Sequence, residues 1–329
     1  MRAPRHVSPR RGFPAALAAG LFVSSFARAQ AWLPPKGEAS LSFGYGNVFV
    51  NRHYLGTADN PSDAVESDYG HIRSQSFGIG LTYGVTDKLA FSLGVPLIQT
   101  KYYGTPGQNF FPHNISIDDG QYHSTLQDFT IHLGYQALNG PVALSPFVAA
   151  VIPSHAYTTF AHTAAGKHLH EYLLGFSVGG RLDRLVPGSY LEATYSYAFV
   201  ERLMGIHHDR SNVFLELGYF VTPSLSLRGI ATGLYTHGGY AFESPQTTPP
   251  ELFPIHDRIG HDEGLDVGAG ISYLLTGSTE VYASYLKQVE GRGGHKIANA
   301  LSFGVSWSFS PQQVGRRLFA SKSSGSAGE

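Results

Sequence analysis

Roughly a dozen short stretches of the chain alternate large apolar residues with small or polar ones, which is the period of a β-strand. The clearest is 301–309, with Leu, Phe, Val, Trp and Phe at the odd positions and Ser or Gly at the even ones. Successive side chains of a strand point to opposite faces, so each stretch has one apolar and one polar face. A sheet with lipid on one face and water on the other must have no free edge, because unpaired backbone groups are costly in lipid. Only a closed sheet meets this condition. The sequence therefore predicts an all-β protein, an antiparallel transmembrane outer-membrane β-barrel of about twelve strands.

The alternation also predicts where the strands lie. They are expected around residues 39–50, 74–84, 89–100, 126–138, 142–153, 172–178, 191–199, 213–219, 225–227, 265–273, 281–285 and 301–309. The strand at 142–153 is apolar on both faces, so its register stays open, and the strand beginning at Leu225 is weak because it leads into Gly-rich sequence. Pro96 falls on an inward face, where its missing N–H predicts a bulge or a strand end.

The links between these strands alternate in length. Five are short, at 85–88, 138–141, 183–189, 221–224 and 275–278. The alternating ones are mostly long, at 52–73, 101–125, 154–170, 202–210, 237–263 and 290–296. Bacterial barrels place short turns in the periplasm and long loops outside the cell. With an even number of strands, both termini of the chain are expected in the periplasm.

The two ends of the chain differ from the barrel segment, residues 32–309. Residues 1–31 match a secretory signal peptide, because a start rich in Arg precedes an apolar stretch at 12–23. Cleavage could follow either Ala29 or Ala31. The Ser/Gly-rich residues 310–329 are expected to form a disordered periplasmic tail. Phe309 would be the terminal aromatic residue that the barrel-insertion machinery reads, although the tail follows it.

Charge and cysteine content exclude several classes of protein. The chain has 23 Lys and Arg, 24 Asp and Glu, and no Cys. Five Arg lie in the signal with no acidic residue, so the mature chain has 18 basic and 24 acidic residues and a formal charge of −6. This balance, without a basic stripe, argues against a nucleic-acid partner. The lack of Cys excludes a lipid-anchored lipoprotein, disulfides and thiolate metal sites, and no motif predicts a cofactor.

Charged residues on inward faces predict a constriction of the lumen. Glu216 is expected opposite Arg228, and Arg181 opposite Glu192, as two oppositely charged cross-strand pairs near the periplasmic end. Further polar lining comes from Asp128, His132 and Asp266. Two interpretations remain open, a constriction that selects or gates a solute and a layer of ion pairs that closes a small barrel.

Histidines gather in the long links and at strand tips, several of them beside acidic residues. Imidazole and carboxylate together can bind Zn, Cu, Ni or Fe. The candidate metal ligands are His168, His170, His207, His208, His256 and His261. Compact ligand spacing such as His-Glu-x-x-His is not found, so polar loop residues without a metal are the alternative.

Aromatic residues at the ends of the barrel predict contact with the lipid–water boundary. Trp32, Trp307 and Phe309 are expected to be membrane-interface anchors. In the longest links, three Phe either line the entry of an apolar ligand or pack within a loop cap. These are Phe110, Phe111 and Phe253.

The segment 207–212 (HHDRSN) contains the ingredients of a serine hydrolase. It superficially resembles the His-x-Ser-Asn region of outer-membrane phospholipase A, another twelve-stranded barrel. A His two residues from its Ser shares a face with it, whereas His208 and Ser211 are three residues apart and face opposite sides of a regular strand. The sequence therefore predicts no enzyme.

Four stretches carry a family resemblance: 31–37 (AWLPPKG), 85–90 (VTDKLA), 126–129 (LQDF) and 291–309, which ends in LSFGVSWSF. They are similar to bacterial outer-membrane transporters grouped as the MetA pathway of phenol degradation. The resemblance implies a Gram-negative outer-membrane barrel, and the family's label implies the passage of small, aromatic or apolar molecules.

These patterns together predict an outer-membrane channel for the passive passage of small solutes, with outer-membrane lipid and the barrel-insertion machinery as its other partners. The alternative is a non-conducting outer-membrane surface protein with a structural, adhesive, or ligand- or metal-binding role.

Overall fold

The computed structural model describes residues 31–55, 65–67, 70–104, 117–159, 163–241, 249, 251–252 and 255–312. Residues 1–30 of the predicted signal and 313–329 of the predicted tail lie outside the described residues, as do His113, His162 and the three loop Phe. The signal peptide and the disordered tail therefore stay predictions.

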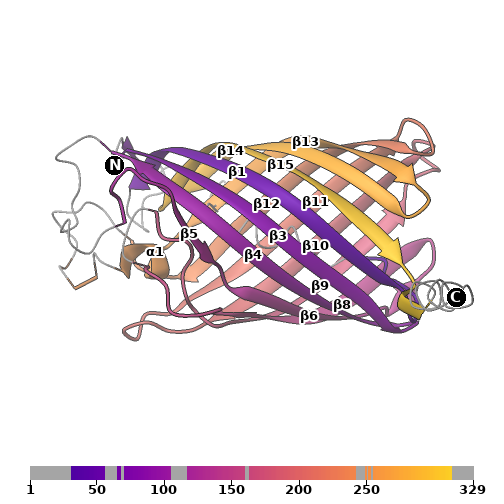
Figure 1. Ribbon diagram of the computed structural model, residues 1–329, viewed down its shortest axis with the longest axis horizontal. Coiled ribbons are helices and arrows are strands. Elements are labelled where there is room, and N and C mark those ends of the chain that lie inside the picture. Colours follow the sequence, from indigo (N-terminus) through magenta and orange to yellow (C-terminus); the bar gives the residue numbers. More distant parts are fainter. Residues whose placement is uncertain are drawn as a thin grey trace, which may run out of the picture.

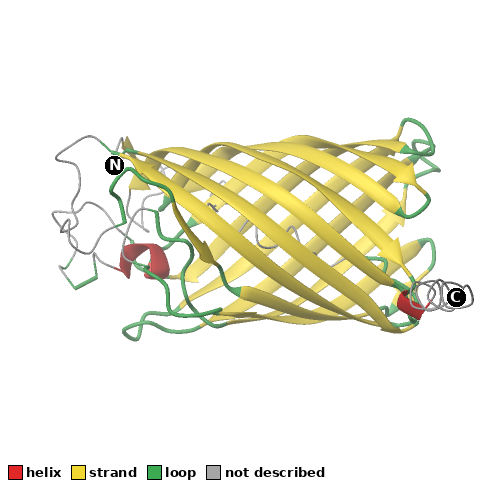
Figure 2. Ribbon diagram, in the orientation of Figure 1, coloured by secondary structure: helices red, strands yellow, loops and turns green. Residues whose placement is uncertain are grey.

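The described chain is almost entirely β-structure (Figure 2). The strands are β1 (Ala39–Leu55), β2 (Val65–Ser67), β3 (His71–Thr86), β4 (Leu89–Tyr103), β5 (His123–Leu126), β6 (Phe129–Tyr135), β7 (Leu138–Asn139), β8 (Val142–Ile152), β9 (Glu171–Arg181), β10 (Ser189–Val200), β11 (His208–Phe220), β12 (Leu225–Gly238), β13 (Glu263–Thr276), β14 (Thr279–Arg292) and β15 (His295–Phe309). The short helix α1 (His256–Ile259) lies in the link before β13.

Each long strand pairs antiparallel with its neighbours in the chain, and β15 pairs with β1, which closes the sheet. The segments β5, β6 and β7 share one place in the wall, and β2 only extends the edge of β1, so the barrel has 12 strands. The predicted fold class is confirmed. Among the described residues, closure leaves none of the 12 strands of the wall with a free row of N–H and C=O groups, as a lipid environment requires.

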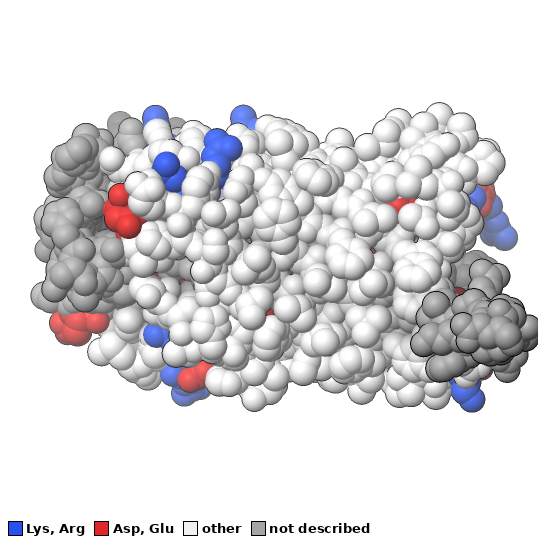
Figure 3. Space-filling model, viewed as in Figure 1, with Lys and Arg blue, Asp and Glu red and all other residues white. Residues whose placement is uncertain are grey.

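The two faces of the wall differ as the alternation predicts. Outward side chains are apolar and exposed, for example Phe77, Leu174 and Phe303, and inward positions carry mostly small or polar side chains. On the face seen in Figure 3, Lys, Arg, Asp and Glu lie mainly toward the two ends, and a broad band between them is nearly free of charge. Such a band suits the hydrocarbon of a bilayer.

Two predicted strands differ in the structure. The strand expected at 126–138 is broken at Gln127–Asp128, where the register on β4 shifts by one residue and Gln127 N donates to Pro96 O (2.9 Å). The bulge predicted at Pro96 thus falls on the neighbouring strand. The weak strand beginning at Leu225 is complete, since its glycines pair within the ladder of β11 and β13.

The barrel has two distinct ends (Figure 1). Tight turns after β3, β7, β9, β11 and β13 lie at one end together with the end of β15, and we call it the short-turn end. The long links and α1 lie at the other, the long-loop end. Among the described residues, no helix has the length and apolar character needed to cross a bilayer.

Candidate functional site: the lumen and its two ends

Near the short-turn end, three inward side chains form a polar cluster. Tyr190 Oη donates to Glu216 Oε1 (2.7 Å), and Arg228 Nη1 lies 3.5 Å from Glu216 Oε2. The arginine and the glutamate are largely buried. The predicted proximity of Glu216 and Arg228 is present, but Arg228 pairs directly with Gly218, so the contact is diagonal. The turn holds two more residues than expected, and a shift of two preserves the face of every side chain.

The second predicted pair, Arg181 with Glu192, is not formed. Arg181 lies at the tip of β9, opposite Tyr190, and binds Asp183 through Nε–Oδ2 (2.9 Å) and Nη2–Oδ1 (3.0 Å). Its side chain is about half exposed. Glu192 Oε1 instead accepts a hydrogen bond from Ala31 N (2.9 Å). Asp183, two residues along the chain, thus takes the place of Glu192 as the partner of the Arg181 guanidinium.

Inward apolar side chains pack into a buried group beyond the charged cluster, and we call them the apolar belt. Its buried members are Val48, Val50, Ile72, Tyr102, Ile230, Leu286, Ile297 and Ala300, with Phe214 packed against them. The belt begins beside the charged cluster, because Ile230 pairs directly with Glu216. Small inward residues dominate the sequence pattern, so the belt was not predicted. Several of its residues, such as Ile72, Tyr102 and Ile230, lie just beyond the strand ranges that the sequence predicts.

His132 and Asp266 are both buried on the inner wall, as predicted. His132 packs against the ring of Phe147, with ring centroids 4.7 Å apart, and neither of its ring nitrogens has a hydrogen-bond partner among the described residues. Asp266 Oδ2 accepts a hydrogen bond from Thr232 Oγ1 (3.4 Å). The two residues lie on β6 and β13 and form no common site.

At the long-loop end, polar contacts hold the link between β8 and β9 against the wall. Asp128 is buried and accepts a hydrogen bond from Tyr157 Oη (2.7 Å), and Tyr157 Oη accepts one from His168 N (3.0 Å). Arg258 of α1 donates to the carbonyl oxygens of Lys167 (2.8 Å) and His168 (3.1 Å). Asp128 therefore helps to hold the described part of this link.

A salt bridge joins the same loop to the start of β13. Lys167 Nζ lies 3.0 Å from Asp262 Oδ2. Burial raises the pKa of Asp262, but the attraction and hydrogen bond of Lys167 outweigh it and hold the pKa below 3.8. Because the pKa is depressed in the folded state, this stabilisation is present above pH 3.8 and is lost as the pH falls through the lower folded value.

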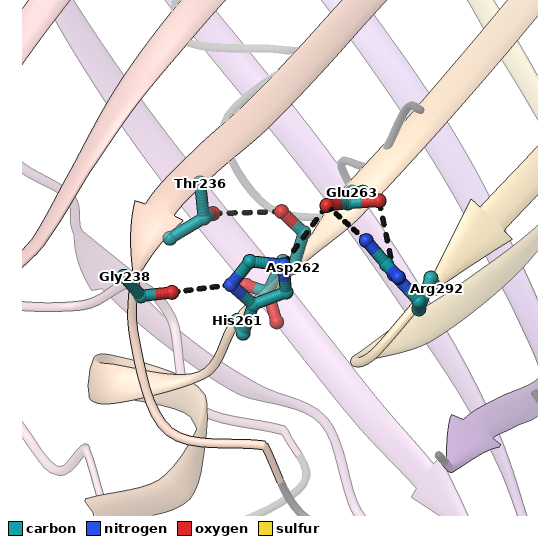
Figure 4. Close-up of polar contacts among 6 residues, drawn as sticks. All are labelled: Thr236, Gly238, His261, Asp262, Glu263 and Arg292. Atoms are coloured by element: carbon teal, nitrogen blue, oxygen red, sulfur yellow. Dashed lines mark hydrogen bonds and ion pairs between the residues drawn. The ribbon is translucent and has the colours of Figure 1, made fainter. Parts of the chain in front are cut away.

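Figure 4 shows the residues that flank this salt bridge. His261 Nε2 lies 2.9 Å from Glu263 Oε1, and Arg292 grips both oxygens of Glu263 through Nε (3.0 Å) and Nη2 (2.6 Å). The hydrogen bond of Glu263 raises the pKa of His261 above 6.5. Thr236 Oγ1 donates to Asp262 O (2.7 Å). The link before β13 is thereby fixed to β12, β13 and β14.

The six histidines predicted as metal ligands are not brought together. Each of four binds a different carboxylate: His170 with Glu201, His207 with Asp209, His256 with Asp257, and His261 with Glu263. In the part of the chain that the structure describes, no group of three or more His, Cys, Asp or Glu has the geometry of a metal site. The local His–carboxylate pairs are contacts within the loop cap.

The aromatic anchors divide. Trp307 is exposed and its ring stacks on Phe309, with centroids 4.3 Å apart, at the short-turn end. Trp32 instead lies inside the barrel, because a Cβ on the inward-facing Gly179 would stand 2.5 Å from its ring. The prediction of Trp32 as a membrane-interface anchor is wrong. The residues that follow the predicted signal lie in the interior of the barrel and not on its lipid-facing surface.

Ser211 does approach a histidine, but it is His237 of β12 rather than His208. Ser211 Oγ lies 2.8 Å from His237 Nε2 and 3.0 Å from the hydroxyl of Tyr195. A nucleophile–base pair needs a third group that orients the base. Within the described ranges, the second ring nitrogen of His237 makes no hydrogen bond to a carboxylate. Ser211 and His237 come together through the register of β11 on β12, which the local sequence does not predict.

Comparison with known proteins gives matches to structures alone. No family model and no curated protein matches the chain. The COG4313 outer-membrane channel from Pseudomonas putida F1 is 14% identical with a TM-score of 0.64, over 85% of this chain and 98% of that one. The NanC porin (9% identity, TM-score 0.46, 81% and 98% covered) and the translocator domain of the autotransporter NalP from Neisseria meningitidis (12%, 0.47, 88% and 99%) match less well. The first likeness shows that the chain has the fold of an outer-membrane barrel.

Proposed function

We propose that the chain is a passive outer-membrane channel for small solutes, with its short-turn end in the periplasm and its long-loop end outside the cell. The observation that carries the proposal is the lining of the lumen. It changes from a charged cluster at Glu216 and Arg228 to the apolar belt. A strongly charged solute would lose hydration along the belt without finding a charged partner. An apolar solute would instead be stabilised there, because its surface leaves water.

The belt also supports the narrower proposal that the solutes are small aromatic or apolar compounds. Phe214 and Tyr102 contribute rings to it, and Ile230 and Leu286 contribute branched side chains. Aromatic rings favour offset or edge contacts with other rings, so a flat apolar solute would find partners on this wall. The family resemblance of the sequence points to the same class of solute.

Recordings from planar lipid bilayers test the proposal. The purified barrel is expected to give discrete conductance steps that change when Glu216→Gln or Arg228→Gln removes one charge of the cluster. Benzyl alcohol is expected to interrupt the current where glycerol does not, and Leu286→Ser is expected to weaken that interruption. A folded barrel that gives no conductance would instead support a non-conducting surface protein.

A further inference from the structure

The segment that precedes β1, Ala31–Gly37, lies inside the short-turn end of the barrel, and we call it the N-terminal strap. Ala31 is fully buried at its start. At its other end, Lys36 N donates to Asp87 Oδ1 (3.1 Å), and Gly37 adopts a φ of +79° as the chain turns into β1. A positive φ costs little for glycine, so the sequence permits this turn.

Three side chains bind the backbone of the strap: Glu192 of β10, Ser145 of β8, and Gln136, which directly follows β6. Glu192 Oε1 accepts from Ala31 N (2.9 Å). Gln136 Nε2 and Ser145 Oγ both donate to Ala31 O (2.8 Å each), and Gln136 Oε1 accepts from Leu33 N (2.8 Å). These contacts satisfy polar backbone groups that would be costly to leave unpaired inside the wall.

Three inward glycines provide the space that the strap occupies. A Cβ on Gly179 would stand 2.5 Å from the ring of Trp32 and 2.8 Å from Cβ of Ala31. A Cβ on Gly134 would lie 3.4 Å from a methyl of Leu33, and one on Gly84 would collide with the carbonyl oxygens of Pro34 and Pro35. Consecutive parts of the strap thus sit over β9, β6 and β3.

The strap spans the mouth from one side of the barrel to the other. Its end joins β1, and its start binds Glu192 on β10, which lies six strands from β1 in a ring of twelve. The contacts to β3, β6, β8 and β9 lie between these two points. Half of the inner circumference is therefore covered. The other half begins with the cluster of Tyr190, Glu216 and Arg228.

We propose that the N-terminal strap is a specificity-determining element of the channel, forming one wall of its short-turn mouth, with the Tyr190–Glu216–Arg228 cluster forming the other. Glu192 is the positioning residue that holds the start of the strap. The inference rests on the proposed channel function and says which residues form the short-turn mouth of that channel. It requires Ala31 in the mature protein, which corresponds to signal cleavage after Ala29.

The absence of cysteine allows a direct test, because Ala31→Cys creates a single thiol in the strap. In the purified full-length mature barrel, a membrane-impermeant maleimide is expected to label it slowly. Glu192→Leu removes the acceptor of Ala31 N, and Gly179→Val fills the space of Trp32. Each is expected to raise the labelling rate about tenfold or more, as loss of a hydrogen bond to a charged group predicts. In planar bilayers, both are expected to increase conductance and the size of solute admitted.

Two matched variants control for general damage to the wall. Glu192→Gln keeps an oxygen acceptor and is expected to retain slow labelling. Gly229→Val makes the same change as Gly179→Val at a position where the nearest atom to a new Cβ is Leu217 O at 3.9 Å, and it is expected to change neither readout. Heat-modifiable migration in gels confirms that each variant is folded.

Three outcomes would overturn the inference while leaving a channel intact. They are rapid labelling in the Ala31→Cys parent, faster labelling in the two releasing variants with unchanged conductance, and a mature protein whose mass shows that Ala31 is missing. Absence of conductance in the wild-type barrel would overturn the proposed function itself, and the inference with it.

Discussion

At the scale of single residues, the charges of Glu216 and Arg228 should set the ionic preference of the lumen. Glu216→Gln leaves the guanidinium uncompensated and is expected to favour anions, whereas Arg228→Gln leaves the carboxylate and is expected to favour cations. The change in permeability ratio should be a few-fold, since a unit charge about 4 Å away in water is worth about 1 kcal/mol. Reversal potentials across a KCl gradient measure it, and shifts of the same sign would contradict the assignment.

Arg181 supplies the matched control for that measurement. It is also an arginine near the short-turn end, but it is exposed and bound to Asp183 at the tip of its strand. Arg181→Gln is therefore expected to shift the reversal potential less than Arg228→Gln does. A larger shift from Arg181→Gln would place the constriction at the rim of the barrel rather than within it.

The same residues show what the sequence could predict. Strict alternation places Glu216 and Arg228 on the inner face, and that prediction survives the register difference because the difference is two residues. The register itself depends on turn hydrogen bonds such as Val221 N to Leu225 O (2.9 Å), which residue types alone do not fix. Glu192 could not be assigned to the strap, since its partner is a backbone N–H 161 residues away.

At the scale of elements, the strands were predictable and the contacts between loops were not. A strand reveals itself through a period of two over ten or more residues. The salt bridge between Lys167 and Asp262 joins residues 95 apart, and nothing in either local sequence selects the partner. The break between β5 and β6 was also missed, because its cause lies partly in Pro96 on another strand.

The contact of α1 with the link between β8 and β9 gives a prediction at this scale. Arg258 donates to the carbonyl oxygens of Lys167 and His168. Arg258→Met removes both hydrogen bonds, so the link should open more often and expose the bond after Lys167 to trypsin. Loss of even one bond to a charged donor corresponds to roughly tenfold faster cleavage when local opening limits the reaction. Mass spectrometry of the digested barrel identifies the cut.

Two variants make this cleavage interpretable. Lys167→Gln in the Arg258→Met background removes the trypsin site and should abolish the fragment. Arg202→Met removes an exposed arginine from the link between β10 and β11 and should leave the bond after Lys167 protected. Equal cleavage in the wild-type protein would show that α1 does not hold the loop.

At the scale of the whole molecule, the pairing of β15 with β1 closes the barrel, so each strand has one face toward lipid and one toward the lumen. Neighbouring residues of a strand therefore face different surroundings. Phe303 is 56% exposed on the outer face of β15, and its neighbour Ser302 faces inward. Phe303→Lys should lower the free energy of unfolding in lipid vesicles by about 2–4 kcal/mol, the cost of a cation near the middle of a bilayer. Ser302→Lys should cost clearly less, since the lumen offers its ammonium polar surroundings. Urea titration in vesicles compares the two, and equal costs would mean that the two faces of the strand do not meet different solvents.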